Sequence, residues 1–116
     1  MDCAYRLSLQ DRLLIYTLSM KIYYVDIDET ICTSPASRNY HDAIPIKENI
    51  EKINKLYAAG NTIVYWTSRG SRKQINWYDL TKNQLDEWGV KYHELRVDKP
   101  YYDRFIDDKT LRIEEL

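Results

Sequence analysis

The sequence predicts an α/β fold built around a parallel sheet. Two kinds of segment alternate: strand-like runs at residues 22–27, 62–66, 90–95 and 104–106, and helical patterns at 47–59 and 71–88. Short connections between such elements imply right-handed crossovers and parallel neighbouring strands. With 116 residues, 44% hydrophobic and 30% charged, the chain has the composition of one small globular domain.

The predicted first strand differs clearly in composition from the segment that follows it. Residues 22–27 form a β-branched and aromatic run, which is typical of a buried central strand. Residues 30–45 carry Ser, Pro, Asn, His and Asp without periodicity, so we expect a long loop. Long loops in small domains often serve function.

The helices are predicted from apolar spacing and end signals. Residues 47–59 place apolar side chains on one helical face, and Gly60 follows as a stop. Ser71 can cap a second helix that runs to about Trp88 and ends at Gly89.

Residues 1–19 read as an N-terminal extension that precedes a domain at 20–116. Their leucines are interrupted by Arg6 and Arg12, whereas a signal peptide needs an unbroken apolar region. The extension is either a poorly ordered segment upstream of Met20 or a short amphipathic helix packed on the domain.

Composition excludes several classes of function. Seventeen basic and eighteen acidic residues give a net charge of −1, which offers no general attraction to nucleic acid or to an anionic membrane. Apolar runs stay well short of the roughly 18 residues of a membrane span. Cys3 and Cys32 are too few for a disulfide framework, so we expect a reduced, cytoplasmic setting.

Polar residues cluster where the predicted strands end. They are Asp26 and Asp28 after the first strand, Thr67 and Ser68 after the second, Lys99 before the fourth, and Asp107 and Asp108 after it. Ligands of parallel sheets bind beyond the carboxyl ends of the strands, so these residues are expected to meet at one rim.

This set of residues fits phosphoryl transfer. Asp26 and Asp28 are two apart on a strand and point to the same side. Asp26 would be a nucleophile that forms an aspartyl-phosphate, and Asp28 a general acid and base. Thr67, Ser68 and Lys99 would bind the phosphoryl oxygens, Ser68 through its backbone N–H.

Clustered carboxylates repel one another unless a cation joins them, and hard oxygen ligands favour Mg²⁺. We expect Asp26, Asp28, Asp107 and Asp108 to form that site, with the direct ligand among the last two left open. His41 and Arg69 are candidate substrate contacts. The alternatives are that His41 is only solvated and that Arg69 merely pairs with a surface carboxylate.

The arrangement resembles the haloacid dehalogenase-like (HAD) superfamily of phosphatases at all four of its motifs. The matching residues are Asp26-Ile27-Asp28-Glu29-Thr30, Thr67, Lys99 and Asp107-Asp108, with Glu29 where many members carry Gly. The resemblance covers residues 20–116. Residues 67–70 and 99–109 look like the small capsule-biosynthesis phosphatase branch.

The resemblance implies a three-layer Rossmann-like sheet flanked by helices. It also implies that Asp26 and Asp107 bind Mg²⁺ by side chain and Asp28 by its backbone carbonyl. Asp98 departs from the pattern, since relatives often carry Gly before the lysine. The chain ends soon after the fourth motif, so we expect a minimal sheet and a homo-oligomer that supports it. No cap domain fits between the motifs, so specificity must come from residues 30–45, a neighbouring subunit or a large substrate.

The predicted function is a Mg²⁺-dependent phosphomonoesterase for a small phosphorylated metabolite, with a sugar phosphate as the leading candidate. A phosphatase of nucleic-acid ends is an alternative that the near-neutral charge disfavours. A receiver-like phospho-accepting module would carry its acidic residues in another order. A catalytically inactive binding protein is the last alternative, because all the expected groups are present.

Overall fold

The computed structural model describes residues 8–10, 20–37, 39–70 and 76–116. Most of the N-terminal extension therefore lies outside the described residues, and so does the predicted start of the second helix at residues 71–75. None of the described helices has the length and apolar composition that a membrane span requires.

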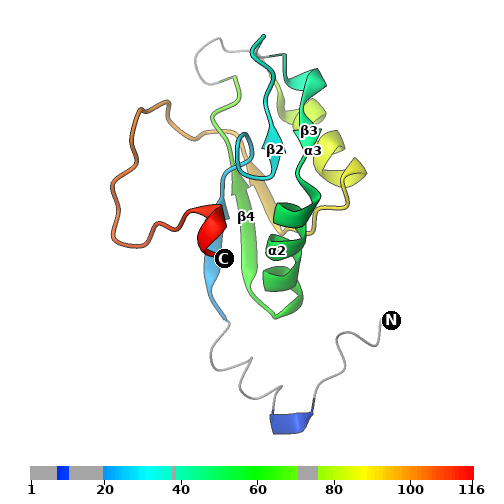
Figure 1. The fold of residues 1–116 in the computed structure, drawn as a ribbon, viewed down its shortest axis with the longest axis vertical. Helices are drawn as coiled ribbons and strands as arrows, with labels where there is room; N and C mark the ends of the chain where they lie inside the picture. The colour runs from blue at the N-terminus through cyan, green and yellow to red at the C-terminus, as the bar shows by residue number, and fades with distance from the viewer. Residues whose placement is uncertain (1–7, 11–19, 38, 71–75) are drawn as a thin grey trace.

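Three parallel strands form the main sheet, in the order β1 (Ile22–Val25), β4 (Thr62–Trp66) and β5 (Glu94–Arg96) (Figure 1). Ile22 lies opposite Thr62, and Val64 lies opposite Glu94. The predicted α/β fold with a parallel sheet is confirmed. Among the described residues, however, the central strand is β4 and β1 lies at an edge, so the expectation of a central first strand is wrong.

Both helices pack on one face of this sheet. Ile50 of α2 (Lys47–Ala58) and Leu85 of α3 (Tyr78–Glu87) belong to the same core cluster as Ile63 and Tyr65 of β4. The crossovers β1–β4 and β4–β5 step across the sheet in the same direction, and right-handed connections then place both helices on the same side. Figure 1 shows α2 and α3 beside each other on that side. The described residues thus form two layers rather than the expected three.

The C-terminal ends of both helices follow the predicted signals, whereas α3 begins at Tyr78 rather than just after Ser71, because residues 76 and 77 are not helical. Gly60 (φ 102°) comes just after α2, and Gly89 (φ 72°) comes just after α3. These left-handed backbone angles cost glycine little and strain other residues, which explains why each helix stops there.

The long connection after β1 contains more structure than expected. A two-stranded antiparallel sheet of β2 (Cys32–Thr33) and β3 (Ile44–Pro45) closes it. The short 3-10 helix η2 (Tyr40–Asp42) lies between these two strands.

The predicted fourth strand at residues 104–106 does not form. Residues 97–112 hold no helix or strand and form a wide loop on the side of the sheet opposite α2 and α3, before the 3-10 helix η3 (Ile113–Glu115) (Figure 1). A parallel neighbour needs a crossover of about a dozen residues or more, and residues 97–103 are too few to provide one after β5.

One buried hydroxyl in the core gives a test of the packing. Tyr65 is fully buried, and its hydroxyl has no hydrogen-bond partner among the described residues. Burial also raises the pKa of this phenol. Because an unpaired buried polar group costs about 1–3 kcal/mol, Tyr65→Phe should raise the free energy of unfolding by about 1 kcal/mol in urea denaturation. The same change at the exposed Tyr78 should leave it unaltered. A less stable Tyr65→Phe protein would show that the hydroxyl is bonded.

Candidate active site

Asp26 and Lys99 meet at the carboxyl end of the sheet. Asp26 directly follows β1, and its Oδ1 lies 3.5 Å from Lys99 Nζ. The backbone N–H of Lys99 donates to the carbonyl of Thr67 at the end of β4, at 3.2 Å. The structure therefore brings together three residues that were predicted from different strand ends.

The two charged side chains of this pair differ in exposure. The Lys99 side chain is 10% exposed, whereas the Asp26 side chain is 41% exposed. Partial burial raises the pKa of Asp26, while the charge of Lys99 opposes this rise. Within the part of the chain that the structure describes, Asp26 is thus a partly exposed carboxylate paired with Lys99.

Thr67 is fixed by contacts on both of its sides. Its N–H donates to the carbonyl of Arg96 at 2.9 Å, which continues the β4–β5 pairing, and its Oγ1 accepts the N–H of Arg69 at 3.2 Å. Thr67 is 1% exposed, and Ser68 after it is half-buried. A phosphoryl-binding role for both stays a prediction.

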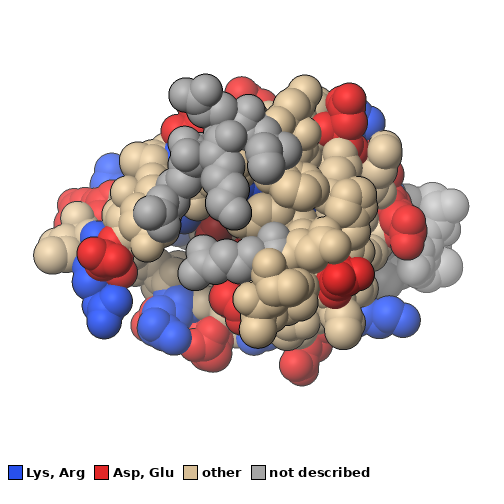
Figure 2. All heavy atoms as spheres, turned by 90° about the horizontal axis from the view of Figure 1, so that it is seen from above, with Lys and Arg blue, Asp and Glu red and all other residues tan. Residues whose placement is uncertain are grey.

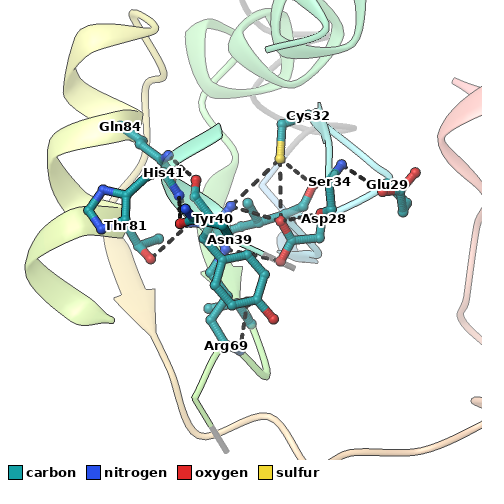
Figure 3. A network of polar contacts seen from close by, with 12 residues as sticks. Asp28, Glu29, Cys32, Ser34, Asn39, Tyr40, His41, Arg69, Thr81 and Gln84 are labelled. Carbon is teal, nitrogen blue, oxygen red and sulfur yellow. Dashed lines mark hydrogen bonds and ion pairs between the residues drawn. The ribbon is translucent and has the colours of Figure 1, made fainter. Parts of the chain in front are cut away.

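Asp28 is held by a buried arginine (Figure 3). Arg69 Nε donates to Oδ2 at 3.0 Å, and Arg69 Nη2 donates to Oδ1 at 2.8 Å. Ser34 Oγ donates to Oδ1 at 2.9 Å. Bidentate pairs of this kind fix orientation as well as charge, so the Asp28 carboxylate has a set position two residues after Asp26.

The remaining donors of Arg69 are also used. Nη1 donates to Thr81 Oγ1 at 3.1 Å and to Gln84 Oε1 at 2.6 Å, and Nη2 contacts Cys32 Sγ at 3.7 Å. The guanidinium also lies 4.6 Å from the centre of the Tyr40 ring. A guanidinium has five N–H donors, and all of them have partners here. Arg69 is fully buried and pairs with a carboxylate, but that carboxylate is Asp28 of the candidate site, 22% exposed, rather than the expected surface group.

The partners on α3 were not predicted, although the sequence carries a signal for them. Thr81 and Gln84 are three residues apart and share the buried face of α3 with Leu85. Polar side chains within a buried helical stripe need hydrogen-bond partners. Gln84 also donates through Nε2 to the carbonyl of Tyr40 at 2.7 Å, so α3 holds both η2 and the arginine.

His41 lies on η2 and is exposed. Its ring meets Trp77 edge-on, with 5.7 Å between ring centres. A contact of His41 with substrate stays a prediction.

Asp107 and Asp108 do not reach the candidate site. Both are exposed in the segment of residues 97–112, and Asp107 Oδ1 accepts the N–H of Lys109 at 3.2 Å. The described residues contain no group of three His, Cys, Asp or Glu side chains that could hold a metal ion. The missing fourth strand explains this difference from the prediction, because that strand was expected to carry the two aspartates to the rim.

Among the described residues, the four predicted magnesium ligands are not gathered in one place, and the magnesium site stays a prediction. Asp26 is paired with Lys99, and both oxygens of Asp28 already accept hydrogen bonds from Arg69. The other two predicted ligands, Asp107 and Asp108, lie in residues 97–112, which we call the C-terminal segment.

The charge of Asp98, a departure from the family pattern, is neutralised locally. Its carboxylate accepts hydrogen bonds from Arg96 Nη2 at 2.7 Å and from Trp66 Nε1 at 2.9 Å. These two contacts lower the pKa of Asp98 to about 2. The neighbouring Lys99 ammonium instead pairs with Asp26.

Glu29 adopts a backbone conformation that favours glycine. Its φ is 64°, and its side chain Oε1 accepts the N–H of Ser34 at 2.8 Å. Left-handed angles cost other residues roughly 1 kcal/mol relative to glycine. We expect Glu29→Gly to be more stable than Glu29→Ala by about 1 kcal/mol in urea unfolding, because both lose the Ser34 contact and only glycine relieves the strain. Equal stabilities would contradict this backbone assignment.

An open depression of about 530 Å³ lies elsewhere, along α3 and β5. Tyr57, Tyr78, Tyr92 and His93 are among the residues that line it. None of its lining residues belongs to the candidate site, so it does not enter the chemistry.

Comparison with solved structures finds a similar fold. The crystal structure of an MCSG target from Vibrio cholerae matches with a TM-score of 0.72 and 28% sequence identity, over 83% of this chain and 86% of that chain. Neither a protein-family model nor a curated protein matches the chain. The α/β fold is thus shared with a solved protein over most of both chains.

Proposed function

We propose that the protein is a phosphomonoesterase that transfers the phosphoryl group of a small phosphorylated metabolite to Asp26 and then to water. The pairing of Asp26 with Lys99 at the carboxyl end of a parallel sheet carries this proposal. A carboxylate alone repels a phosphate ester. The adjacent ammonium offsets that repulsion and leaves the carboxylate able to attack.

The reaction would proceed in two displacements. An oxygen of Asp26 attacks phosphorus, the bond to the leaving oxygen breaks, and an aspartyl-phosphate forms. Water then attacks this phosphorus, the Asp26 carboxylate leaves, and inorganic phosphate is released. Lys99 balances the charge on the phosphoryl oxygens in both steps, and the backbone N–H of Ser68 would donate a hydrogen bond to one of them.

Asp28 is proposed to move the protons. It would give a proton to the leaving oxygen in the first step and take one from water in the second. Its side chain is 22% exposed, so the carboxylate is not fully closed off from solvent. Arg69 keeps this carboxylate in one orientation throughout.

Membership of the HAD superfamily is part of the proposal. It is supported by the convergence of Asp26, Thr67 and Lys99, and by the left-handed backbone at Glu29, where many members carry glycine. Magnesium dependence stays a prediction from the sequence, because the C-terminal aspartates lie apart from this group.

A small substrate is favoured over a polynucleotide. Figure 2 looks from above onto the end of the molecule where the strands end, and there basic and acidic side chains alternate around the rim. The described residues on this face show no continuous basic surface. Proteins that bind polynucleotides usually present one.

The proposal is tested by phosphate release from p-nitrophenyl phosphate and a panel of sugar phosphates, each with Mg²⁺ and with EDTA. The unaltered protein should release phosphate. Lys99→Met should lower the rate of release by roughly a hundredfold or more, because losing one charge-stabilising group costs that much. Lys91→Met, an exposed lysine elsewhere, should keep the activity. No release from any compound in either condition, by a folded protein, would refute the function. Equal rates with Mg²⁺ and EDTA would refute the metal requirement alone.

A further inference from the structure

Four aromatic rings form a continuous strip on the sheet face that the helices leave uncovered. The rings of Tyr24 and Trp66 are 5.5 Å apart, those of Trp66 and Phe105 are 6.5 Å apart, and those of Phe105 and Tyr102 are 5.4 Å apart. The first two belong to β1 and β4, and the other two belong to the C-terminal segment. We call these four residues the aromatic strip.

One end of the aromatic strip lies at the candidate site. Lys99 Nζ is 5.1 Å from the centre of the Tyr102 ring and 5.7 Å from that of the Trp66 ring. The same ammonium is 3.5 Å from Asp26. A phosphate at Lys99 would therefore have its organic group beside these rings.

The strip is only partly covered by its own contacts. Tyr102 is 39% exposed, Phe105 is 44% exposed and Tyr24 is 51% exposed. Single exposed apolar residues are common on proteins, but a contiguous apolar surface beside a polar site usually marks a place of binding. Its remaining surface can accept one more ring in stacked or edge-on geometry.

We propose that the aromatic strip is the surface that recognises the organic part of the substrate, and that the substrates are phosphate monoesters whose organic group is an aromatic ring. This inference rests on the proposed function through the phosphate-binding role of Lys99. The ring of the ester stacks on Tyr102 and Phe105, while its phosphate reaches Lys99 and Asp26. Phe105, which lies within the predicted fourth strand at residues 104–106, thus contributes to specificity instead.

The test is a comparison of two phosphonates whose P–C bond is not cleaved by this chemistry. Binding of phenylphosphonate and of methylphosphonate is measured by calorimetry on the full chain. The unaltered protein should bind phenylphosphonate about tenfold more tightly or better, since stacking on an aromatic side chain is worth that much. Tyr102→Leu and Phe105→Leu should each reduce this preference to about threefold or less.

Two matched variants separate stacking from general damage to the segment. Tyr102→Phe keeps the ring and should keep the preference. Ile106→Ala removes a side chain that is 96% exposed in the same segment and should also keep it. Thermal unfolding of each variant confirms that the fold is intact.

The outcomes distinguish this inference from the proposed function. Preferential phenylphosphonate binding without phosphate release from any ester would refute the function and leave the recognition surface standing. Phosphate release without the preference would refute the recognition surface alone. A preference that survives both leucine substitutions in folded proteins, or no binding of either phosphonate, would also overturn the inference.

Discussion

Asp26→Asn should abolish phosphate release, lowering kcat by roughly a thousandfold or more, because the amide cannot form the acyl phosphate. The measurement is kcat for p-nitrophenyl phosphate at saturating substrate. The pH profile of the unaltered protein gives a second reading. Partial burial raises the pKa of Asp26. As the pH is lowered, Asp26 should therefore become protonated, and kcat/KM should fall, at a higher pH than for an ordinary aspartate.

The same substitution should not destabilise the fold. A carboxyl whose pKa is raised in the folded state favours folding at low pH, and this contribution is lost as the pH rises through that pKa. At neutral pH the ionised Asp26 therefore weakens the folded state, so Asp26→Asn should leave the free energy of unfolding unchanged or raise it. Asp79→Asn, on the exposed first turn of α3, is the control for a general charge effect. An inactive variant that is also less stable would point to a structural role for Asp26.

Arg69→Met should lower the free energy of unfolding by about 3 kcal/mol, the lower end of the range for breaking a buried ion pair. The substitution leaves the Asp28 carboxylate without its bidentate partner. It also removes the donor that satisfies Thr81 and Gln84 in the core. The lower end of the range applies because the Asp28 side chain is 22% exposed and can regain some water. Urea denaturation measures the effect.

A double-mutant cycle shows whether the loss comes from the pair. Asp28→Asn combined with Arg69→Met should cost less than the sum of the two single changes, because no unpaired charge is then left behind. Lys82→Met breaks the ion pair with Asp86, in which both side chains are about half exposed, and should change stability little. Additive losses in the cycle would mean that the guanidinium acts through packing rather than through Asp28.

Much of the fold and part of the site could be predicted from the sequence, because the relevant signals are local. The apolar run of β4 and the helical spacing of α2 each specify an element from neighbouring residues. Parallel strands place their carboxyl ends at one edge, and this rule predicts that Asp26, Thr67 and Lys99 lie close together. The charge balance likewise disfavoured a polynucleotide substrate without reference to structure.

The tertiary structure decided what depends on partners distant in the chain. Arg69 is 41 residues from Asp28 in the sequence, and its role depends on which carboxylate the fold places within reach. The C-terminal segment has strand-like residues, but too few residues separate it from β5 for a parallel crossover, so Phe105 and Tyr102 turn onto the open sheet face instead. Local preference sets what a segment can form, whereas chain length and available pairing edges set what it does form. For this protein, Asp26 and Lys99 belong to the first group, and the aromatic strip and the buried arginine belong to the second.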